Sequence, residues 1–276
     1  IRFVHGSILD DDAVSDALEG ARTIFHLAAL GSVPRSVEEP QRSWSVNATG
    51  TVRVLEGARR IWKSPRAGDR VVFAASSSAY GEDPTLPKVE TQPTRPLSPY
   101  AASKLAGEAA LCAWAHSYGF SPVGLRYFNI FGPRQAADSA YAAVIAAFAR
   151  RLLSGQPPII FGDGTQSRDF TSVTNAVLAT MLAGAADRHL RGEVMNIGTG
   201  RRVTLLELAR IMAERCGVGH LQPEMAPKRA GDVPHSLADF SKAKELIGYA
   251  PIASLEDGLE ETLAYYRREM ASSGRR

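Results

Sequence analysis

The sequence predicts an α/β protein with a doubly wound parallel sheet, and three observations support this fold class. Short apolar or β-branched runs alternate with longer helical patterns, as in successive βαβ units. The 276 residues are 45% hydrophobic and 22% charged, enough to bury a core in one large domain or two closely joined ones. Polar residues directly follow one of the apolar runs, as at the carboxyl end of a parallel strand.

Five apolar runs are predicted as strands and seven longer patterns as helices. The predicted strands cover 1–6, 23–29, 70–76, 122–128 and 192–198. The predicted helices lie near 11–19, 43–62, 98–118, 139–154, 173–185, 204–216 and 254–270. Ser98 and Pro99 are good first residues for the third helix, and Gly119 is a good stop. Thr204 and Glu207 are spaced as a capping box.

Composition argues against several classes of function. The net charge is +3, and the arginines are scattered among acids, so no nucleic-acid partner is predicted. The two cysteines, Cys112 and Cys216, lie far apart without metal-ligand spacing. This usage suits a reducing cytoplasm and predicts neither a disulfide nor a metal site. No apolar run approaches the roughly 18 residues that span a bilayer, so no membrane partner is expected.

The start of the helix predicted over 98–118 carries a possible acid/base pair. Tyr100 and Lys104 stand at i and i+4 and therefore share one helix face. The ordinary pKa of tyrosine, near ~10, is too high for a general base at neutral pH. A neighbouring ammonium favours the phenolate and lowers that pKa. The serines 76–78 directly follow the run 70–76, where one hydroxyl could bridge the tyrosine and a substrate hydroxyl.

A serine, a tyrosine and a lysine in this arrangement resemble the catalytic triad of the short-chain dehydrogenase/reductase superfamily. Further motifs occur in the order seen in its extended members: HLAALGSVPRS (26–36), VNATGT (46–51), SSSAYGE (76–82), SPYAASKLAGE (98–108), LRYFNIFGPRQ (125–135), FGDGTQSRDF (161–170), NIGTG (196–200) and RAGDVPHSLADFSKA (229–243). These motifs cover nearly the whole chain. The sequence therefore resembles the NAD-dependent epimerase/dehydratase family and looks most like its UDP-N-acetylglucosamine 4-epimerases.

The resemblance implies two domains and a missing loop. A Rossmann-like dinucleotide-binding domain is expected over 1–128, with 170–198 returning to it. A smaller α/β substrate-binding domain is expected mostly from 129–169 and 199–276. Family members begin with a glycine-rich turn that holds the NAD pyrophosphate, and no such turn is present. We therefore expect that roughly the first two βα units of the fold precede this sequence. The resemblance also implies a homodimer.

The resemblance assigns residues to three roles. Ser76, Tyr100 and Lys104 match the catalytic triad, and Ser77 or Ser78 could share the role of the hydroxyl. The NAD-binding positions are matched by Ile8, Leu27, Ala28, Ala29, Asn47, Tyr100, Lys104, Tyr127 and Phe128. The UDP-sugar positions are matched by Ser77, Ser78, Asn129, Arg168, Arg229, Asp232 and Ser236. No residue is assigned to a metal.

Two positions narrow the reaction that the resemblance implies. Ser77 and Ser78 stand where related 4,6-dehydratases carry an acidic pair, and serines cannot supply that acid/base step. Ser236 stands where epimerases restricted to UDP-glucose and UDP-galactose tend to carry tyrosine, so it leaves room for an N-acetyl group. The implied function is NAD-dependent 4-epimerisation of UDP-GlcNAc and UDP-GalNAc, and also of UDP-glucose and UDP-galactose, through a 4-keto intermediate. The alternatives are another nucleotide-sugar epimerase or decarboxylase, or a non-catalytic protein that binds a nucleotide sugar or dinucleotide.

Overall fold

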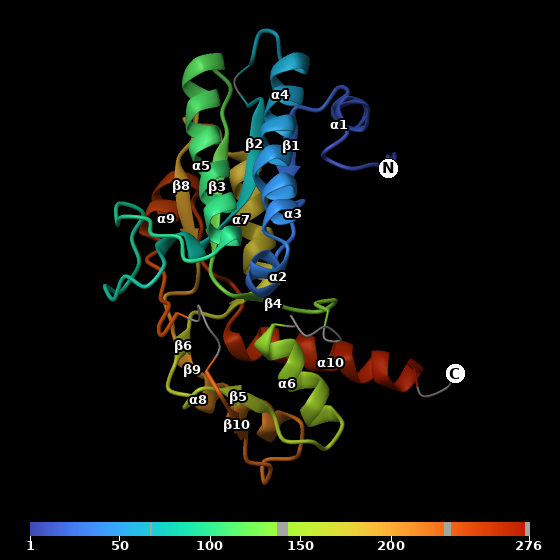
Figure 1. Cartoon of the computed structure of the whole chain (residues 1–276), viewed down its shortest axis with the longest axis vertical. Coiled ribbons are helices and arrows are strands. Elements are labelled where there is room, and N and C mark those ends of the chain that lie inside the picture. The colour runs from blue at the N-terminus through green and yellow to red at the C-terminus, as the bar shows by residue number, and fades with distance from the viewer. Residues whose placement is uncertain (67, 137–142, 229–232, 274–276) are drawn as a thin grey trace.

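The computed structural model describes residues 1–66, 68–136, 143–228 and 233–273, and its centre is a parallel sheet. Within these residues the sheet has four strands in the order β1–β2–β3–β8, which are Thr23–His26, Arg70–Ser76, Val123–Tyr127 and Val194–Ile197. Figure 1 shows the sheet in the upper part of the molecule, with helices in front of it and behind it. The predicted α/β fold class is confirmed, as are four of the five predicted strands.

Helices cover both faces of this sheet because alternate residues of each strand point to opposite sides. Val71 and Phe73 of β2 pack in one core with α4 (Gly50–Ile61) and α5 (Pro99–Tyr118). Val72 packs on the other side, in the core that includes residues of α7 (Val173–Ala185) and α9 (Ser241–Ile247). The short elements α2 (Val33–Glu38), α3 (Pro40–Trp44) and the π-helical turn η1 (Ser45–Thr49) lead from β1 into α4.

The strand predicted over 1–6 is wrong. These residues form no strand, and the large side chains of Ile1 and Phe3 are exposed. The chain reaches α1 (Asp11–Leu18), which packs against α4, without joining the sheet. An apolar β-branched run becomes a strand only when it pairs with another strand, and among the described residues β1 pairs with β2 alone.

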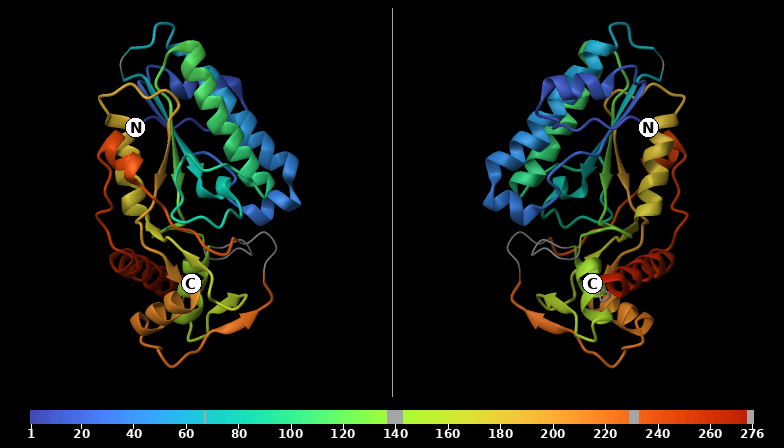
Figure 2. Two further views of the ribbon diagram at one scale, coloured as in Figure 1. Left: turned by 90° about the vertical axis from the view of Figure 1, so that its left-hand side faces the viewer. Right: turned by 90° about the vertical axis from the view of Figure 1, so that its right-hand side faces the viewer.

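The lower part of the molecule has a core of its own. Three two-stranded sheets lie here: β4 (Ile130–Phe131) with β7 (Thr171–Ser172), β5 (Ile159–Phe161) with β10 (Glu224–Ala226), and β6 (Ser167–Arg168) with β9 (Val203–Thr204). The helices are α6 (Val144–Leu153), α8 (Leu205–Arg215) and α10 (Leu255–Ser273), which bury their apolar faces together. Figure 2 shows this part below the sheet from both sides. The predicted domain bounds stay a prediction. Helix α9 lies in the range 199–276 assigned mostly to the substrate-binding domain, and it packs on the central sheet.

Helix α5 approaches the sheet closely and brings its first turn to the carboxyl ends of the strands. Ser98 caps it through a hydrogen bond from Ala101 N–H, and Gly119 ends it in the left-handed region at φ 75°. A Cβ on Gly107 would lie only 2.6 Å from the ring of Phe73, so no larger residue fits at this contact. None of the helices in the described ranges is long and apolar enough to cross a membrane.

Candidate active site

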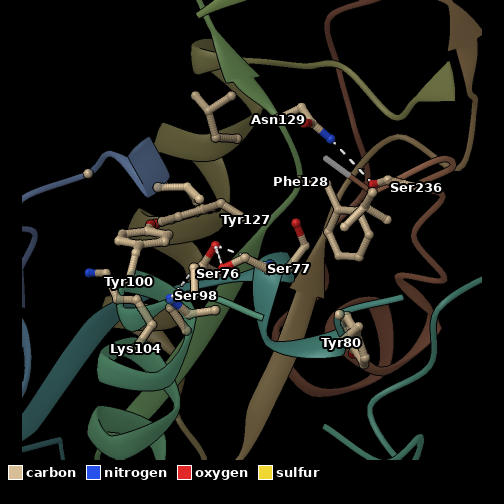
Figure 3. Close-up of a pocket in the computed structure, with 18 of the residues that line it drawn as sticks. Ser76, Ser77, Tyr80, Ser98, Tyr100, Lys104, Tyr127, Phe128, Asn129 and Ser236 are labelled. Atoms are coloured by element: carbon tan, nitrogen blue, oxygen red, sulfur yellow. Dashed lines mark hydrogen bonds between the residues drawn. The ribbon is translucent and has the colours of Figure 1, made fainter. Parts of the chain in front are cut away.

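A crevice of about 560 Å³ opens where β1, β2 and β3 end. Such a position is where ligands bind in open α/β sheets. The crevice extends to the segment 233–236 of the lower part, and Figure 3 shows many of its side chains. Twelve of the residues assigned from the sequence line it: Leu27, Ala29, Ser76, Ser77, Ser78, Tyr100, Lys104, Tyr127, Phe128, Asn129, Arg168 and Ser236.

Three assigned residues that the structure describes do not line the crevice, and two more lie outside the described residues. Arg229 and Asp232 lie outside the described residues. Ala28 is exposed beside Leu27 and Ala29. Ile8 packs on α4, where a Cβ at Gly50 would lie 2.5 Å from its Cδ1. The fifth, Asn47, is buried just behind the crevice, and the predicted NAD contacts of Ile8 and Ala28 stay predictions.

Asn47 connects the chain after β1 to helix α5. Its Oδ1 accepts a hydrogen bond from Leu30 N–H at 2.8 Å, and its Nδ2 donates to Leu30 O and to the Ser103 hydroxyl. That hydroxyl in turn donates to Tyr100 O. Asn47 belongs to the π-helical turn η1, a geometry that is frequent at functional sites. It therefore positions backbone on two walls of the crevice without lining the crevice itself.

The first turn of α5 places Tyr100 and Lys104 in the crevice on one face. Tyr100 N–H donates to the Ser36 hydroxyl of α2 at 3.0 Å. Lys104 is buried, and its Nζ donates to Ala74 O at 2.8 Å and lies 4.9 Å from the ring centre of Phe73. Burial lowers the pKa of Lys104 to about 8. The prediction that Tyr100 and Lys104 share one helix face is confirmed, since both lie on α5 and line the crevice.

The pKa of Tyr100 shifts in the opposite direction to the sequence expectation. Burial raises it, because the phenolate is costly away from water, and a hydrogen bond with the Ser76 side chain offsets part of this rise. The expectation that Lys104 lowers the pKa of Tyr100 is therefore wrong. The ammonium of Lys104 is directed to Ala74 O, which explains why its charge does not control the phenol.

Of the three serines at the end of β2, Ser76 and Ser78 bring their hydroxyls together and Ser77 points elsewhere (Figure 3). Ser76 begins the 3₁₀ turn η2 (Ser77–Tyr80), accepting a hydrogen bond from Ser78 N–H. The hydroxyls of Ser76 and Ser78 are 2.8 Å apart and share a hydrogen bond. Figure 3 shows Ser76 on the side of Tyr100, with Ser77 farther away toward Phe128. Ser76 lies nearer to Tyr100 than Ser77 does (Figure 3), and its side chain offsets part of the rise in the pKa of Tyr100.

Small side chains line the part of the crevice beside β1 and β2. Ala29, Gly31, Ala74 and Ala75 lie along it, and a Cβ on Gly31 would meet nothing within 4 Å. Leu27 leaves 56% of its surface uncovered at the end of β1. Open space, an uncovered apolar side chain and one buried ammonium fit the flat rings and ribose of a dinucleotide. The residues present therefore fit NAD on this side.

His26, the last residue of β1, stabilises this side as a neutral imidazole. Its Nε2 is 2.8 Å from Thr51 Oγ, and the Thr51 hydroxyl donates to Asn47 O at 2.6 Å. Since the Thr51 proton is used in that bond, Thr51 Oγ must accept from His26, which assigns the Nε2–H tautomer. Burial lowers the pKa of His26 to about 4, and the charge of Lys104 contributes to the shift.

On the opposite side, two residues assigned to the sugar nucleotide meet. Asn129 adopts a left-handed backbone with φ 40°, uncommon for a residue other than glycine. Its Nδ2 donates to Ser236 Oγ and to Asp169 O, both at 3.3 Å, as Figure 3 shows for Ser236. Arg168 Nη1 donates to Pro234 O at 3.0 Å. The ends of β3 and β6 therefore hold the segment 233–236 against the crevice.

The sequence reasoning did not assign the remaining lining residues to the site. They come mainly from loops: Gly31, Val33, Ala74, Ala75, Tyr80, Gly81, Lys88, Leu97, Ser98, Ala101, Ile130, Val233 and His235. Lys88 is buried, and its Nζ bonds Asp83 O. The unusual length of the loop 82–97 is the signal that could have indicated Lys88 and Leu97. No group of three or more His, Cys, Asp or Glu that could hold a metal gathers within the described ranges.

Fold and crevice together define a class, the Rossmann-like α/β proteins that bind ligands at the carboxyl ends of parallel strands. The family model for the NAD dependent epimerase/dehydratase family matches residues 1–198, and the chain belongs to this family. Its members are enzymes that act on nucleotide sugars, and its cofactor is NAD.

Relatives and solved structures agree with this placement. The chain is 37% identical to a UDP-glucose 4-epimerase of Mycolicibacterium smegmatis over 97% of this chain and 83% of the relative. It is 36% identical to the structure of a UDP-N-acetylglucosamine 4-epimerase from Methanobrevibacter ruminantium in complex with UDP-N-acetylmuramic acid, with a TM-score of 0.89 over 96% of this chain and 82% of that one. The Thermotoga maritima UDP-glucose 4-epimerase with UDP-glucose also gives 36% and 0.89, over 96% and 84%.

The state of His26 predicts a specific pH dependence of stability. Its pKa falls from 6.5 to about 4 on folding, so the unfolded chain binds more protons between these values. The free energy of unfolding should therefore rise with pH in this window by up to about 1.4 kcal/mol per pH unit from this group. In His26→Gln, which keeps a donor for Thr51, the free energy of unfolding from urea denaturation should rise less steeply with pH between 4 and 6.5 than in the wild type. Equal slopes for the variant and the wild type would contradict the assignment.

Proposed function

We propose that the protein is a UDP-sugar 4-epimerase that interconverts UDP-GlcNAc and UDP-GalNAc and also accepts UDP-glucose and UDP-galactose. The observation that supports this most is the crevice that Ser76, Tyr100 and Lys104 line together, in which Lys104 is buried. A phenol beside a hydroxyl in such a crevice can exchange a proton with a sugar hydroxyl bound there.

The proposed chemistry is a reversible oxidation at C4 of the sugar, which removes a hydride from C4 and a proton from the 4-hydroxyl. Tyr100, as phenolate, takes the proton of the 4-hydroxyl, with Ser76 hydrogen-bonded to both groups. When bound, NAD would supply the hydride acceptor and donor for C4 and would be regenerated in each cycle. After the 4-keto sugar has turned its other face to the cofactor, Tyr100 gives the proton back to the oxygen. Lys104 holds the nicotinamide ribose in this arrangement.

The ionisation of Tyr100 and Lys104 explains why the proposed reaction depends on a bound cofactor. Burial in the crevice favours the neutral phenol of Tyr100 and lowers the pKa of Lys104 to about 8. A bound cofactor with a positively charged ring would favour the phenolate, because an opposite charge nearby lowers the pKa of an acid. Tyr100 thus becomes a base when the partners of the reaction are present. Leu27, Ala29, Tyr127 and Phe128 are proposed to contact NAD.

The proposed specificity rests on the sugar side of the crevice. Ser236 is small, and its hydroxyl accepts from Asn129 at the wall of the crevice. A 2-acetamido group needs room and a polar partner, and both are available beside this serine. Ser77 and Ser78 supply no carboxyl for water elimination, which argues against dehydratase chemistry. The similar structure from Methanobrevibacter ruminantium is that of an enzyme named for an N-acetylated sugar.

We further propose that the protein is a homodimer joined through α4 and α5. The outer face of α5 carries small or apolar side chains that are not fully buried: Ala102, Leu105, Ala106, Ala109 and Ala113. Close packing of two such helices against a second pair would bury this face. Trp44 and Val37 on the neighbouring α3 and α2 are also exposed.

The central test measures the conversion of UDP-GlcNAc to UDP-GalNAc by the full-length protein with NAD. Tyr100→Phe removes the proton-carrying hydroxyl and keeps the ring, so kcat should fall by about 100- to 10,000-fold. Binding of UDP measured by calorimetry should be unchanged in this variant, which serves as the control for folding. The proposal fails if the wild type converts none of the four UDP-sugars, or if Tyr100→Phe retains normal turnover.

The specificity proposal predicts a selective loss. Ser236→Tyr fills the space beside Asn129 and should lower kcat/KM for UDP-GlcNAc by about 10- to 200-fold, the range for a pocket clash of 1–3 kcal/mol. Turnover of UDP-glucose should remain within a few-fold of wild type. Ser236→Ala is the matched control, because it keeps the space and should accept both substrates. Equal losses with both substrates in Ser236→Tyr would reject this role.

A further inference from the structure

We propose that a buried polar chain, Glu108–Arg126–Tyr80–Asn196, is the device that positions Tyr100 against Ser76. This inference rests on the proposed function, because it assigns positioning residues to the same reaction. The four residues come from α5, β3, η2 and β8. These are the elements that carry or adjoin the proposed catalytic side chains, yet Glu108, Arg126 and Asn196 do not line the crevice.

The first link is a two-pronged ion pair between helix and sheet. Arg126 Nε donates to Glu108 Oε1 at 2.9 Å and Nη2 to Oε2 at 2.7 Å, and both side chains are buried. Two parallel hydrogen bonds between planar groups fix distance and orientation together. Glu108 stands eight residues after Tyr100 and four after Lys104, so all three lie on one side of α5. The pair therefore fixes the rotation of the helix that carries Tyr100.

The second link joins this pair to the turn that follows Ser76. The guanidinium carbon of Arg126 lies 4.6 Å from the ring centre of Tyr80, which is fully buried in η2. The Tyr80 hydroxyl donates to Asn196 Oδ1 at 2.7 Å on the next strand. Asn196 Nδ2 then donates to Lys88 O in the loop that leads to α5. The polar chain thus returns to the helix on which it began.

The packing of α5 explains why such a device is needed. The helix meets the sheet through small residues, and a Cβ at Gly107 would lie 2.6 Å from Phe73. Smooth surfaces of small residues allow close approach but offer few interlocking side chains to stop sliding or rotation. A shift of the helix moves Tyr100, which stands about 12 Å from Glu108 along the axis at 1.5 Å per residue. The ion pair stops this movement.

The chemistry of the chain also indicates positioning in preference to stability. A buried ion pair is often no more stabilising than apolar residues of the same size. Arg126 Nη1 is buried without a hydrogen-bond partner among the described residues, which adds a cost. An arrangement with these costs is explained by the geometry that it maintains.

Arg126→Lys tests the proposal, because it keeps the positive charge and removes the two-pronged geometry. In the full-length protein kcat for UDP-sugar epimerisation should fall by about 10- to 100-fold, the effect of misplacing a catalytic group by about 1 Å. KM should change little. Arg70→Lys is the matched control: Arg70 is also buried in the sheet with one unpartnered nitrogen, but it donates to carbonyls after α7, away from the crevice. The Arg70→Lys variant should be less stable than the wild type and should keep the wild-type kcat.

A second readout does not depend on turnover. Ultraviolet difference titration of the NAD-free protein, with Tyr100→Phe as the reference, reports the ionisation of Tyr100. Movement of Tyr100 away from Ser76 in Arg126→Lys should raise the pKa of Tyr100 further, because the Ser76 side chain lowers it. Arg70→Lys should leave this pKa at the wild-type value. If the wild type shows no epimerase activity, the proposed function fails, while this titration still decides the positioning role.

Two results would overturn the inference. The first result is that Arg126→Lys and Arg70→Lys have the same kcat and the same pKa of Tyr100. Both variants are compared at a temperature where circular dichroism shows them folded. The second result comes from Tyr80→Phe, which is used if Arg126→Lys does not fold. This change removes the hydrogen bond to Asn196 and keeps the ring. This variant should lower kcat about two- to tenfold, the value of one hydrogen bond, without changing KM. An unchanged kcat in Tyr80→Phe contradicts the proposal.

Discussion

The juxtaposition of Ser76 and Tyr100 in the crevice (Figure 3) is the constraint on which the site depends. It joins the end of β2 to the start of α5, two elements separated by the turn η2 and the long loop 82–97. Each nearby feature holds one side of it: Ser36 and Ser98 cap the first turn of α5, and Asn47 attaches the chain after β1 to Ser103. The fold therefore serves to bring one hydroxyl and one phenol together at the edge of a crevice.

Burial controls the ionisation of this site more strongly than neighbouring charges do. It raises the pKa of Tyr100, lowers that of Lys104 to about 8 and lowers that of His26 to about 4. All three shifts favour the neutral form, since a charge is costly away from water. In the proposed reaction the proton leaves Tyr100 only when bound partners restore favourable charge.

The sequence allowed much of the fold to be predicted, because local patterns determine it. The alternation of runs indicated the parallel sheet, and Ser98 and Gly119 marked the ends of α5 within one residue. The strand at 1–6 failed because pairing depends on a partner that local propensity does not reveal. Most assigned residues line the crevice, since motifs placed them at strand ends. Lys88 and His235 were missed, because loops bring them there from distant positions. The pKa direction of Tyr100 depends on burial, which spacing alone does not give.

The fate of the hydrogen at C4 tests the central claim most directly. UDP-GlcNAc carrying deuterium at C4 would be converted by the full-length protein, and the UDP-GalNAc formed would be examined by mass spectrometry and proton NMR. A hydride that leaves and returns within one closed site should keep the deuterium at C4 of the product, with none exchanged into water. Loss of the label to solvent, with protium at C4, would contradict 4-epimerisation by internal hydride return in this crevice.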